Sequence, residues 1–323
     1  MMHWQFSETN LVIAPGQING KLDAQHAGSA CVLQIGEQYG IFYWGIGEDG
    51  VYRICQAETR VDSPNDWQPL GNVLGPQEDS NYNCRGPSFP FVVCKDERQW
   101  FMYVGCWGKA REDGKLPNTT GLAISNDGGE SWEYISDEPI LPLDKTYDCE
   151  GTGSVCVLYE GGKFRMYYTA IGSYFDKPHG VQTGHGDVIP RIGVGYAEST
   201  DGIHWVKPLD DLMVAPRGFD TDPYEYISSK PWVIHDGSVY RMWVSTFGTA
   251  YRIRSLVSDD GLDWTWQPSG VDGDFGVGNA DAFDDHQRCY ASVVRYGDEY
   301  RCWYTGNGFG RTGMGYATGV RER

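Results

Sequence analysis

A five-fold internal repeat constrains the fold of this 323-residue chain more than any other feature of its sequence. Each copy has an apolar run, a polar or glycine turn, and a second run rich in aromatic residues, which is the pattern of a β-hairpin. A third run with small residues follows, so the period of about 60 to 70 residues predicts a four-stranded unit. The second runs occupy residues 40–44, 100–104, 164–168, 240–244 and 300–304.

Three copies continue with a Ser-x-Asp-Gly turn that leads to a tryptophan, at residues 125–132, 199–205 and 258–264. Asp-Gly favours a tight turn, and the Ser and Asp side chains can bond to the local backbone. The motif resembles the Asp box of sialidase-type propellers, so we expect a structural role for it. Trp67 holds the matching position in the first copy.

Five copies of a four-stranded unit predict an all-β, five-bladed β-propeller that forms a single domain over residues 1–323. The fifth copy has no fourth strand of its own. Residues 4–7 and 11–15 match the fourth-strand pattern of residues 132–134 and 140–142. We therefore expect the N-terminal strand to join the last blade and close the ring, which removes an exposed sheet edge.

Composition excludes several classes of protein. A net charge of −18 leaves no electrostatic footprint for nucleic acid or for an anionic membrane. We expect neither a signal peptide nor a membrane span, because no basic-then-apolar leader and no apolar run near ~20 residues is present. The nine cysteines include no CxxC pair, which favours free thiols in a reducing cytoplasm over zinc ligands. The oligomeric state cannot be predicted.

When the five copies are aligned, the position just ahead of the first strand holds a polar or charged residue in every copy. The five residues are His26, Arg85, Glu150, Glu225 and His286. Because buried charges are costly unless they are paired or functional, we expect these side chains to meet at the propeller axis. The structural alternative is a salt-bridged plug, in which the arginine and the histidines neutralise the two glutamates.

The pair Glu150 and Glu225 favours a carbohydrate site. Glycoside cleavage needs one carboxylic acid to protonate the leaving oxygen and a second carboxylate as base or nucleophile. Asp148 and Asp23 lie two or three residues ahead of the aligned position in their own copies and are further catalytic candidates. Aromatic residues of the same face that are placed to stack on sugar rings are Tyr82, Trp107, Tyr147, Tyr174 and Tyr224. Cys149 between the two acids is a weaker nucleophile candidate, since no histidine adjoins it.

These blades and turns resemble the five-bladed propeller glycosidases, which include glycoside hydrolase families 43, 32, 62 and 68. The resemblance implies that Glu225 is the general acid and that Asp148 or Glu150 tunes it. Residues 85–87, Arg-Gly-Pro, look like the Arg-Asp-Pro motif of family 32 with glycine in place of aspartate. The first copy departs from family 43, because His26 stands where an aspartate base is expected and Asp23 is the nearest carboxylate.

The resemblance also bears on substrate binding and cofactors. His286 resembles a fifth-blade histidine that lies near a central ion or water in family 43, and His26, Arg85, Trp107, Tyr147 and Tyr224 complete the predicted binding set. No cofactor and no protein metal ligands are predicted, although the resemblance is compatible with a central-channel ion such as calcium. The segment 171–191 is the longest insertion. Its His179, His185 and Asp187 fit no metal motif, so we expect a lid or a subunit contact.

The sequence thus predicts a glycoside hydrolase that acts on a small or furanose-type sugar. Two alternatives stay open. One is a non-hydrolytic sugar-active enzyme, such as a lyase, isomerase or transglycosylase, that uses His26 and His286 for proton transfer. The other is a non-catalytic carbohydrate-binding propeller. Neither the sugar nor the stereochemical outcome follows from the sequence, because the outcome depends on the separation of the carboxylates.

Overall fold

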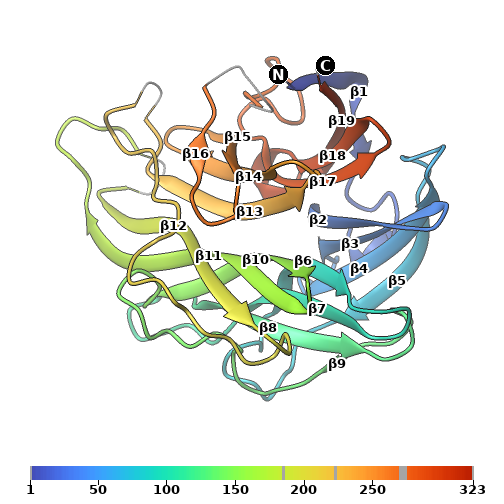
Figure 1. Ribbon diagram of the computed structural model, residues 1–323, viewed down its shortest axis with the longest axis horizontal. Coiled ribbons are helices and arrows are strands. Elements are labelled where there is room, and N and C mark those ends of the chain that lie inside the picture. The colour runs from blue at the N-terminus through green and yellow to red at the C-terminus, as the bar shows by residue number, and fades with distance from the viewer. Residues whose placement is uncertain (1, 184–185, 222–223, 269–274, 322–323) are drawn as a thin grey trace.

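The computed structural model describes residues 2–183, 186–221, 224–268 and 275–321 and shows an all-β chain. Antiparallel sheets are built from strands that follow one another in sequence (Figure 1). Only two short 3-10 helices occur in the described ranges, η1 (Gly20–Leu22) and η2 (Asn307–Phe309). None of the helices in that part of the chain is long and apolar enough to cross a membrane.

Two four-stranded sheets come from the first part of the chain. The strands of the first are β2 (His26–Ile35), β3 (Gln38–Ile46), β4 (Tyr52–Arg60) and β5 (Gln68–Leu74). Those of the second are β6 (Gly86–Cys94), β7 (Trp100–Trp107), β8 (Asn118–Ser125) and β9 (Glu133–Tyr134). Each pairs consecutive strands, as the repeat predicts.

A seven-stranded sheet contains the third and fourth copies of the repeat. Its strands are β10 (Gly151–Glu160), β11 (Lys163–Asp176), β12 (Val188–Ser199), β13 (Ile227–His235), β14 (Tyr240–Phe247), β15 (Tyr251–Ser258) and β16 (Thr265–Trp266). The two copies join where β12 and β13 run parallel, through the single pair Ile192 and Ile227. The fourth strand of the third copy is reduced to isolated bridges that join β12 to Val206 and Val214.

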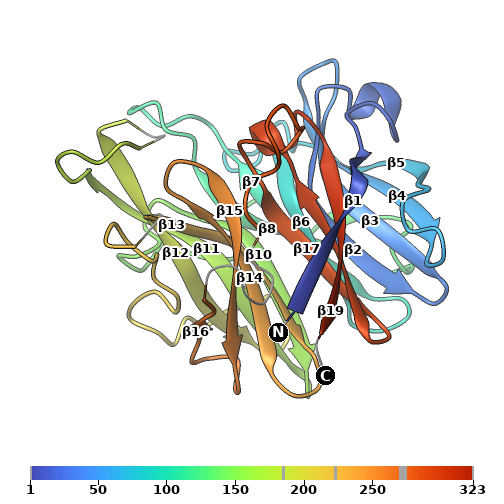
Figure 2. The same ribbon diagram turned by 90° about the horizontal axis from the view of Figure 1, so that it is seen from above.

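The last sheet includes the N-terminal strand. Its order is β1 (Met2–Ile13), β19 (Met314–Arg321), β18 (Glu299–Thr305) and β17 (Cys289–Tyr296). Trp4 pairs with Gly319 and Phe6 with Ala317 in antiparallel register. Figure 2 shows β1 in dark blue beside the red strands of this sheet. The predicted pairing of the N-terminal strand with the last copy is confirmed.

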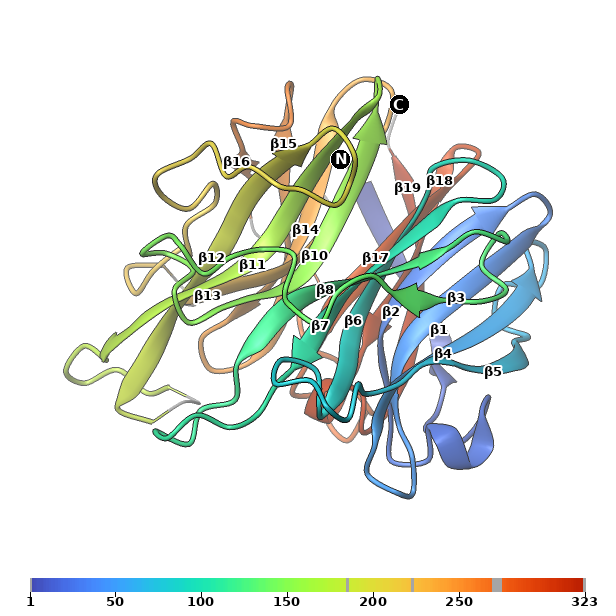
Figure 3. The same cartoon turned by 90° about the horizontal axis from the view of Figure 1, so that it is seen from below.

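The sheets contact one another through their first strands. β2 contacts β6, β6 contacts β10, β10 contacts β13, β13 contacts β17, and β17 contacts β2. Figure 3 shows β6, β10 and β17 near the middle of the molecule, with β5 and β16 at its outer edges. The Val32 amide donates to Ser292 Oγ at 2.9 Å, which connects the last sheet to the first. A cysteine thiol takes the place of the serine hydroxyl between two other first strands, since the Val233 amide of β13 donates to Cys156 Sγ of β10 at 3.1 Å.

Every first strand carries a bulge at the same point, which the repeat does not predict. The pairing with the second strand shifts in register in all five hairpins. In four of them a non-glycine residue adopts the left-handed backbone conformation, namely Ser29, Phe89, Lys230 and Tyr290. Bulges bend a strand and re-aim its side chains, and they are common beside functional sites.

The three Asp-box turns are structural, as predicted. In the first, Ser125 Oγ bonds to Asp127 Oδ1 at 2.7 Å, and hydrogen bonds from Ser131 lower the pKa of the Asp127 carboxyl to about 2. The turns are also anchored to the preceding copy. Tyr103 of β7 donates to the Gly202 carbonyl at 2.8 Å, and Tyr167 of β11 makes the matching bond to Gly261 at 2.9 Å.

Candidate functional site

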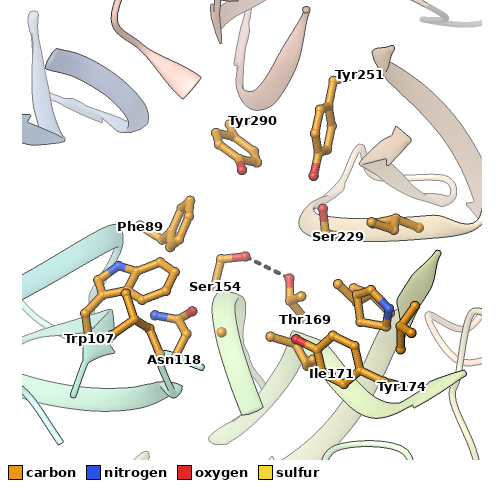
Figure 4. A pocket seen from close by; sticks show the side chains of 16 residues that line it. Phe89, Trp107, Asn118, Ser154, Thr169, Ile171, Tyr174, Ser229, Tyr251 and Tyr290 are labelled. Carbon is orange, nitrogen blue, oxygen red and sulfur yellow. Dashed lines mark hydrogen bonds between the residues drawn. The ribbon is translucent and has the colours of Figure 1, made fainter. Parts of the chain in front are cut away.

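A pocket of about 330 Å³ opens where the entrances of the first strands meet the ends of the second strands (Figure 4). Its wall comes from β6, β10, β13 and β17 and from the hairpins that follow the first three of them. Third strands contribute their first residues, such as Asn118 and Tyr251, whereas the Asp-box turns follow the last residues of third strands. The pocket and the Asp boxes therefore lie at opposite ends of the strands.

One half of the pocket is aromatic. Phe89, Trp107, Tyr251 and Tyr290 line it. The rings of Phe89 and Tyr290 meet edge to face with centroids 5.2 Å apart, and those of Tyr251 and Tyr290 are 6.4 Å apart. The bulges supply two of these rings, since Phe89 and Tyr290 are the residues with left-handed backbone.

The floor of the pocket carries hydroxyl and amide groups. Ser154 Oγ and Thr169 Oγ1 lie 2.8 Å apart, and Thr169 Oγ1 also accepts a hydrogen bond from the Lys230 amide at 2.8 Å. Ser229 Oγ donates weakly to the Ser245 carbonyl at 3.3 Å. Asn118 Nδ2 donates to the Cys106 carbonyl at 3.3 Å. These groups are held in place and present further acceptor or donor capacity to the pocket.

The other half of the pocket is aliphatic. Ile171 of β11, Val188, Pro190 and Ile192 of β12, and Ile227 of β13 form it. The residues lining the pocket in the described part of the chain include no aspartate and no glutamate. The pocket is therefore a place where rings and apolar groups pack, with a small polar floor.

Glu225 lies two residues ahead of β13 and is fully buried, with 0% of its side chain exposed. Arg217 Nη1 donates to Oε2 at 2.8 Å, while Arg254 Nε and Thr246 Oγ1 donate to Oε1 at 2.9 and 2.8 Å. Both oxygens are thus engaged by neighbours. Glu225 stands beside the pocket residue Ile227 without lining the pocket itself.

Glu150 immediately precedes β10, whose Gly153 and Ser154 line the pocket. Its carboxylate forms an ion pair with Arg111, and 22% of its side chain is exposed. Arg111 belongs to the segment between β7 and β8, which also supplies the pocket residue Leu116. Of the four predicted catalytic carboxylates, Glu150 is the one that solvent reaches at the rim.

Asp23 and Asp148 are fully buried and share one arrangement with a third residue, Asp284. Each accepts a hydrogen bond from a tyrosine of the following second strand, at 2.6, 2.7 and 2.9 Å for Tyr43, Tyr168 and Tyr304 respectively. Burial raises the pKa of the Asp23 carboxyl. Lys207 pairs with Asp148 and Arg288 pairs with Asp284. The repetition indicates that the Asp–Tyr pair fixes the entrance of three of the five first strands, β2, β10 and β17.

His26, Arg85 and His286 do not share an environment with the glutamates. His26 is buried, its Nδ1 lies 3.1 Å from the Trp44 carbonyl, and burial lowers the pKa of its imidazole to about 4. Arg85 is exposed, and the side chain of His286 is 85% exposed. The five aligned positions thus range from the core to the surface, rather than meeting in one cluster.

Among the predicted stacking residues, Trp107 and Tyr174 line the pocket. The Trp107 indole donates to Ser88 Oγ at 2.7 Å, which fixes its ring. Tyr147 and Tyr82 are buried and donate to the Leu209 and Ser136 carbonyls. Tyr224 packs against Phe219, with centroids 5.9 Å apart. Only the first two are therefore placed to touch a ligand in this pocket.

Sequence reasoning missed most of the lining. The residues that it did not single out are Phe89, Asn118, Ser154, Thr169, Ser229, Tyr251 and Tyr290. The five aligned polar residues lie three to five residues ahead of the bulges. Glu150, for example, precedes the bulge at Gly153, and Glu225 precedes the bulge at Lys230. A signal was present, since Phe89-Pro90 and Lys230-Pro231 interrupt strand patterns in corresponding places.

The segment 171–191 is less of a loop than expected. β11 continues to Asp176 and β12 begins at Val188, because Tyr174 pairs with Pro190 and Asp176 with Val188. Asp187 forms a 3.0 Å ion pair with Lys177. His185 of the suggested metal set lies outside the described residues. The segment is thus a long hairpin that forms one wall of the pocket.

Lys230, at the bulge of β13, is a buried lysine that the sequence analysis did not single out. Its side chain is fully buried, and its amine has no hydrogen-bond partner among the described residues. Burial lowers the pKa of this amine, which interacts electrostatically with Cys31, Cys156 and Cys289. Its Nζ lies 5.2 Å from the ring of Trp232. Calcium requires six to eight oxygen ligands, none of which this amine supplies, and the central-channel ion that the resemblance allows stays a prediction.

Sequence comparison finds a relative of unassigned function. No protein-family model matches the chain. It is 32% identical over 251 residues to the uncharacterized protein Rv1502 of Mycobacterium tuberculosis, and the match covers 77% of this chain and 76% of the relative.

Structure comparison finds glycoside hydrolases. A complex of BT0996 with RGII matches with a TM-score of 0.72 at 19% identity, over 98% of this chain and 91% of that one. A second match is a protein of the GH130 family of mannoside phosphorylases, a family that contains glycoside hydrolases targeting β-1,2 mannosidic linkages in Candida mannan. Its TM-score is 0.68 at 14% identity, and the match covers 98% of this chain and 93% of that one. A thermostable family-43 glycoside hydrolase matches with a TM-score of 0.63 at 17% identity, over 95% of this chain and 91% of that one. The predicted resemblance to the β-propeller glycosidase superfamily is confirmed for the fold.

Proposed function

The chain belongs to the family of the uncharacterized mycobacterial protein Rv1502, and we propose that it is a carbohydrate-active protein that binds a small glycoside in the axial pocket. The observation that carries this proposal is the pocket itself. Four aromatic rings stand around a floor of hydroxyl and amide groups, at the first-strand entrances of a glycosidase-type fold. Rings stack on the apolar faces of sugars, while a few polar groups fix their orientation.

The reaction that we propose is hydrolysis of the glycosidic bond, with Glu150 as one of the two carboxylates. Glu150 is partly exposed, adjoins the pocket strand β10, and pairs with Arg111 at the rim. A ligand that displaces Arg111 frees this carboxylate to act on the anomeric centre or on a water molecule. Glu225, Asp148 and Asp23 remain the proposals for the second carboxylate, and each requires its buried pairing to open.

A sugar-binding propeller without turnover is the second candidate. The lining of the pocket, within the described residues, has no carboxylate, which favours this function. A non-hydrolytic enzyme that uses His26 and His286 receives less support, because one imidazole is buried and the other is exposed away from the pocket lining.

We further infer that the five copies form one five-bladed propeller domain over residues 1–323, which the contacts between β17 and β2 support. All nine cysteines are free, and six of them are buried. Free thiols support the proposal of a cytoplasmic location.

A panel of 4-nitrophenyl glycosides tests both candidates together. Release of nitrophenol in water supports hydrolysis, and saturable binding without release supports the binding protein. Trp107→Ala weakens either behaviour, because it removes a ring from the pocket wall. Tyr159→Ala is the matched control, since this aromatic side chain is exposed at the far end of β10. If neither binding nor release is found with any sugar of the panel, the proposal is wrong.

A further inference from the structure

The pocket has two unlike halves, and the difference bears on the ligand. Figure 4 shows Phe89, Trp107 and Tyr290 across the cavity from Ile171 and Tyr174. The aromatic half and its hydroxyl floor suit a sugar ring. The aliphatic half offers Ile171, Pro190 and Ile192, which have no hydrogen-bonding side chain to meet sugar hydroxyls.

The aliphatic half reaches the mouth of the pocket and stays open to solvent. Val188 is 51% exposed, Leu116 39% and Tyr174 37%, and all three line the pocket. Scattered apolar residues on a surface need no explanation, but a contiguous apolar rim around a cavity marks a contact for a ligand.

The aliphatic wall is held rigidly. Tyr174 pairs with Pro190 across the β11–β12 hairpin, and Ile192 pairs with Ile227 of β13. Lys115 places its ammonium 3.8 Å from the centre of the Tyr174 ring, a cation–π contact. A preformed apolar wall binds an apolar group without the cost of ordering it.

The polar capacity of the pocket is small. Besides the Trp107 indole, which donates to Ser88, and the hydroxyls of three tyrosines, its polar side chains are Asn118, Ser154, Thr169 and Ser229, and each of these four already makes a hydrogen bond within the protein. No charged side chain lines the cavity in the described part of the chain. A long oligosaccharide, a uronic acid or a sugar phosphate entering here loses hydrogen bonds to water that the pocket does not replace.

We propose that the ligand is a glycoside of one sugar with an apolar aglycone, which is alkyl or aryl. The sugar ring stacks in the aromatic half over the Ser154 and Thr169 hydroxyls, and the aglycone lies along Ile171, Pro190 and Ile192 toward Val188. This inference rests on the proposed function and adds the class of substrate. Each methylene of the aglycone that reaches the wall raises the affinity by about fourfold.

Isothermal titration with methyl and n-hexyl glycosides of glucose, galactose and mannose, below their micellar concentrations, tests the inference. We expect the hexyl glycoside of the preferred sugar to bind at least tenfold more tightly than the methyl glycoside. Val188→Thr, an isosteric change at the wall, is expected to reduce that ratio severalfold, because it weakens binding of the hexyl glycoside more than binding of the methyl glycoside. Val320→Thr is the matched control, since Val320 is 52% exposed on β19, away from the pocket lining.

The outcomes separate the two levels of the proposal. Equal affinity for methyl and hexyl glycosides, or tighter binding of a trisaccharide of the same sugar, overturns the apolar aglycone and leaves the sugar site standing. Hexanol that binds as tightly as the hexyl glycosides overturns the sugar site itself. Absence of binding by every glycoside overturns both. Thermal unfolding of each variant checks that the wall change has not disturbed the fold.

Discussion

Glu150 forms an ion pair with Arg111 at the rim of the pocket, and neither residue belongs to the pocket lining. The carboxylate therefore adjoins the sugar site in a form that is neutralised until a ligand rearranges the pair. A glycosidase needs two carboxyl groups about the scissile bond, and Glu150 is the one of the four candidate carboxylates that solvent reaches. The predictions below separate its role from those of the buried acids.

Glu150→Gln is expected to lower turnover of an aryl glycoside by about 10²- to 10⁴-fold, because it removes one proton-transferring or nucleophilic carboxylate. The affinity for the substrate changes by only a few-fold, since the aromatic rings remain. Initial rates and binding titrations on the same preparation measure both effects. Glu133→Gln, an exposed change on β9, serves as the control. Full activity of the Glu150 variant removes it from the mechanism.

Glu225→Gln is expected to destabilise the fold by about 3–5 kcal/mol, because it removes the buried negative charge that pairs with both Arg217 and Arg254. Glu150→Gln, at a partly exposed pair, costs at most about 1 kcal/mol. Urea unfolding at neutral pH gives both free energies. If the two variants lose equal stability, the buried pairing of Glu225 with Arg217 and Arg254 does not stabilise the fold as expected.

His26 makes the stability of the protein depend on pH. Its pKa is about 4 in the folded chain and about 6.5 in an unfolded one, so the unfolded chain binds more protons between these values. The free energy of unfolding therefore falls by about 3 kcal/mol as the pH drops from 6.5 to 4. In His26→Asn, whose amide can still donate to the Trp44 carbonyl, this component disappears. Urea unfolding of both proteins at pH 7, 5.5 and 4.5 measures this pH dependence. If both proteins lose the same free energy of unfolding as the pH falls, His26 is not its source.

Lys230→Met is expected to raise the free energy of unfolding by about 1–3 kcal/mol at pH 7, since it replaces a buried amine without a hydrogen-bond partner by an apolar chain of similar shape. The gain in the free energy of unfolding shrinks as the pH rises toward 10. The pKa of Lys230 is lower in the folded chain than in the unfolded one, so near pH 10 the unfolded lysine also loses its proton.

EDTA and added calcium are expected to leave the unfolding temperature of the unmodified protein unchanged. A rise with calcium that EDTA reverses indicates an ion in the channel.

The sequence predicts the sheets well and the site poorly, for a physical reason. Hairpins, Asp-box turns and the pairing of β1 with β19 depend on local turn chemistry and alternation, which are visible in one copy of the repeat. The direction of a side chain at a strand entrance depends on the bulge at Ser29, Phe89, Lys230 and Tyr290. A bulge changes the direction of side chains without changing the amino-acid composition of the strand. The aligned residues Glu225 and His26 therefore lie in the core and not in the pocket.

Buried acids show the same limit. Asp23 and Asp148 look catalytic in sequence because each lies two or three residues ahead of the aligned polar position in its own copy. Their partners Tyr43 and Tyr168 stand twenty residues away on the second strand, in positions that read as ordinary core. The recurrence of the pair at Asp284 and Tyr304 is visible once the hydrogen bonds are known. Aligning carboxylates together with second-strand tyrosines would have predicted these buried hydrogen bonds.

The most direct measurement is the indole ¹⁵N–¹H NMR signal of Trp107, assigned with Trp107→Phe, during titration with glycosides. Trp107 lines the pocket, whereas Trp132 follows an Asp-box turn at the other end of the strands. We predict a saturable shift of the Trp107 signal with the glycoside that binds, at the same concentrations that give binding heat, and no shift of the Trp132 signal. A glycoside that binds or turns over while the Trp107 signal stays unmoved contradicts the sugar site in this pocket.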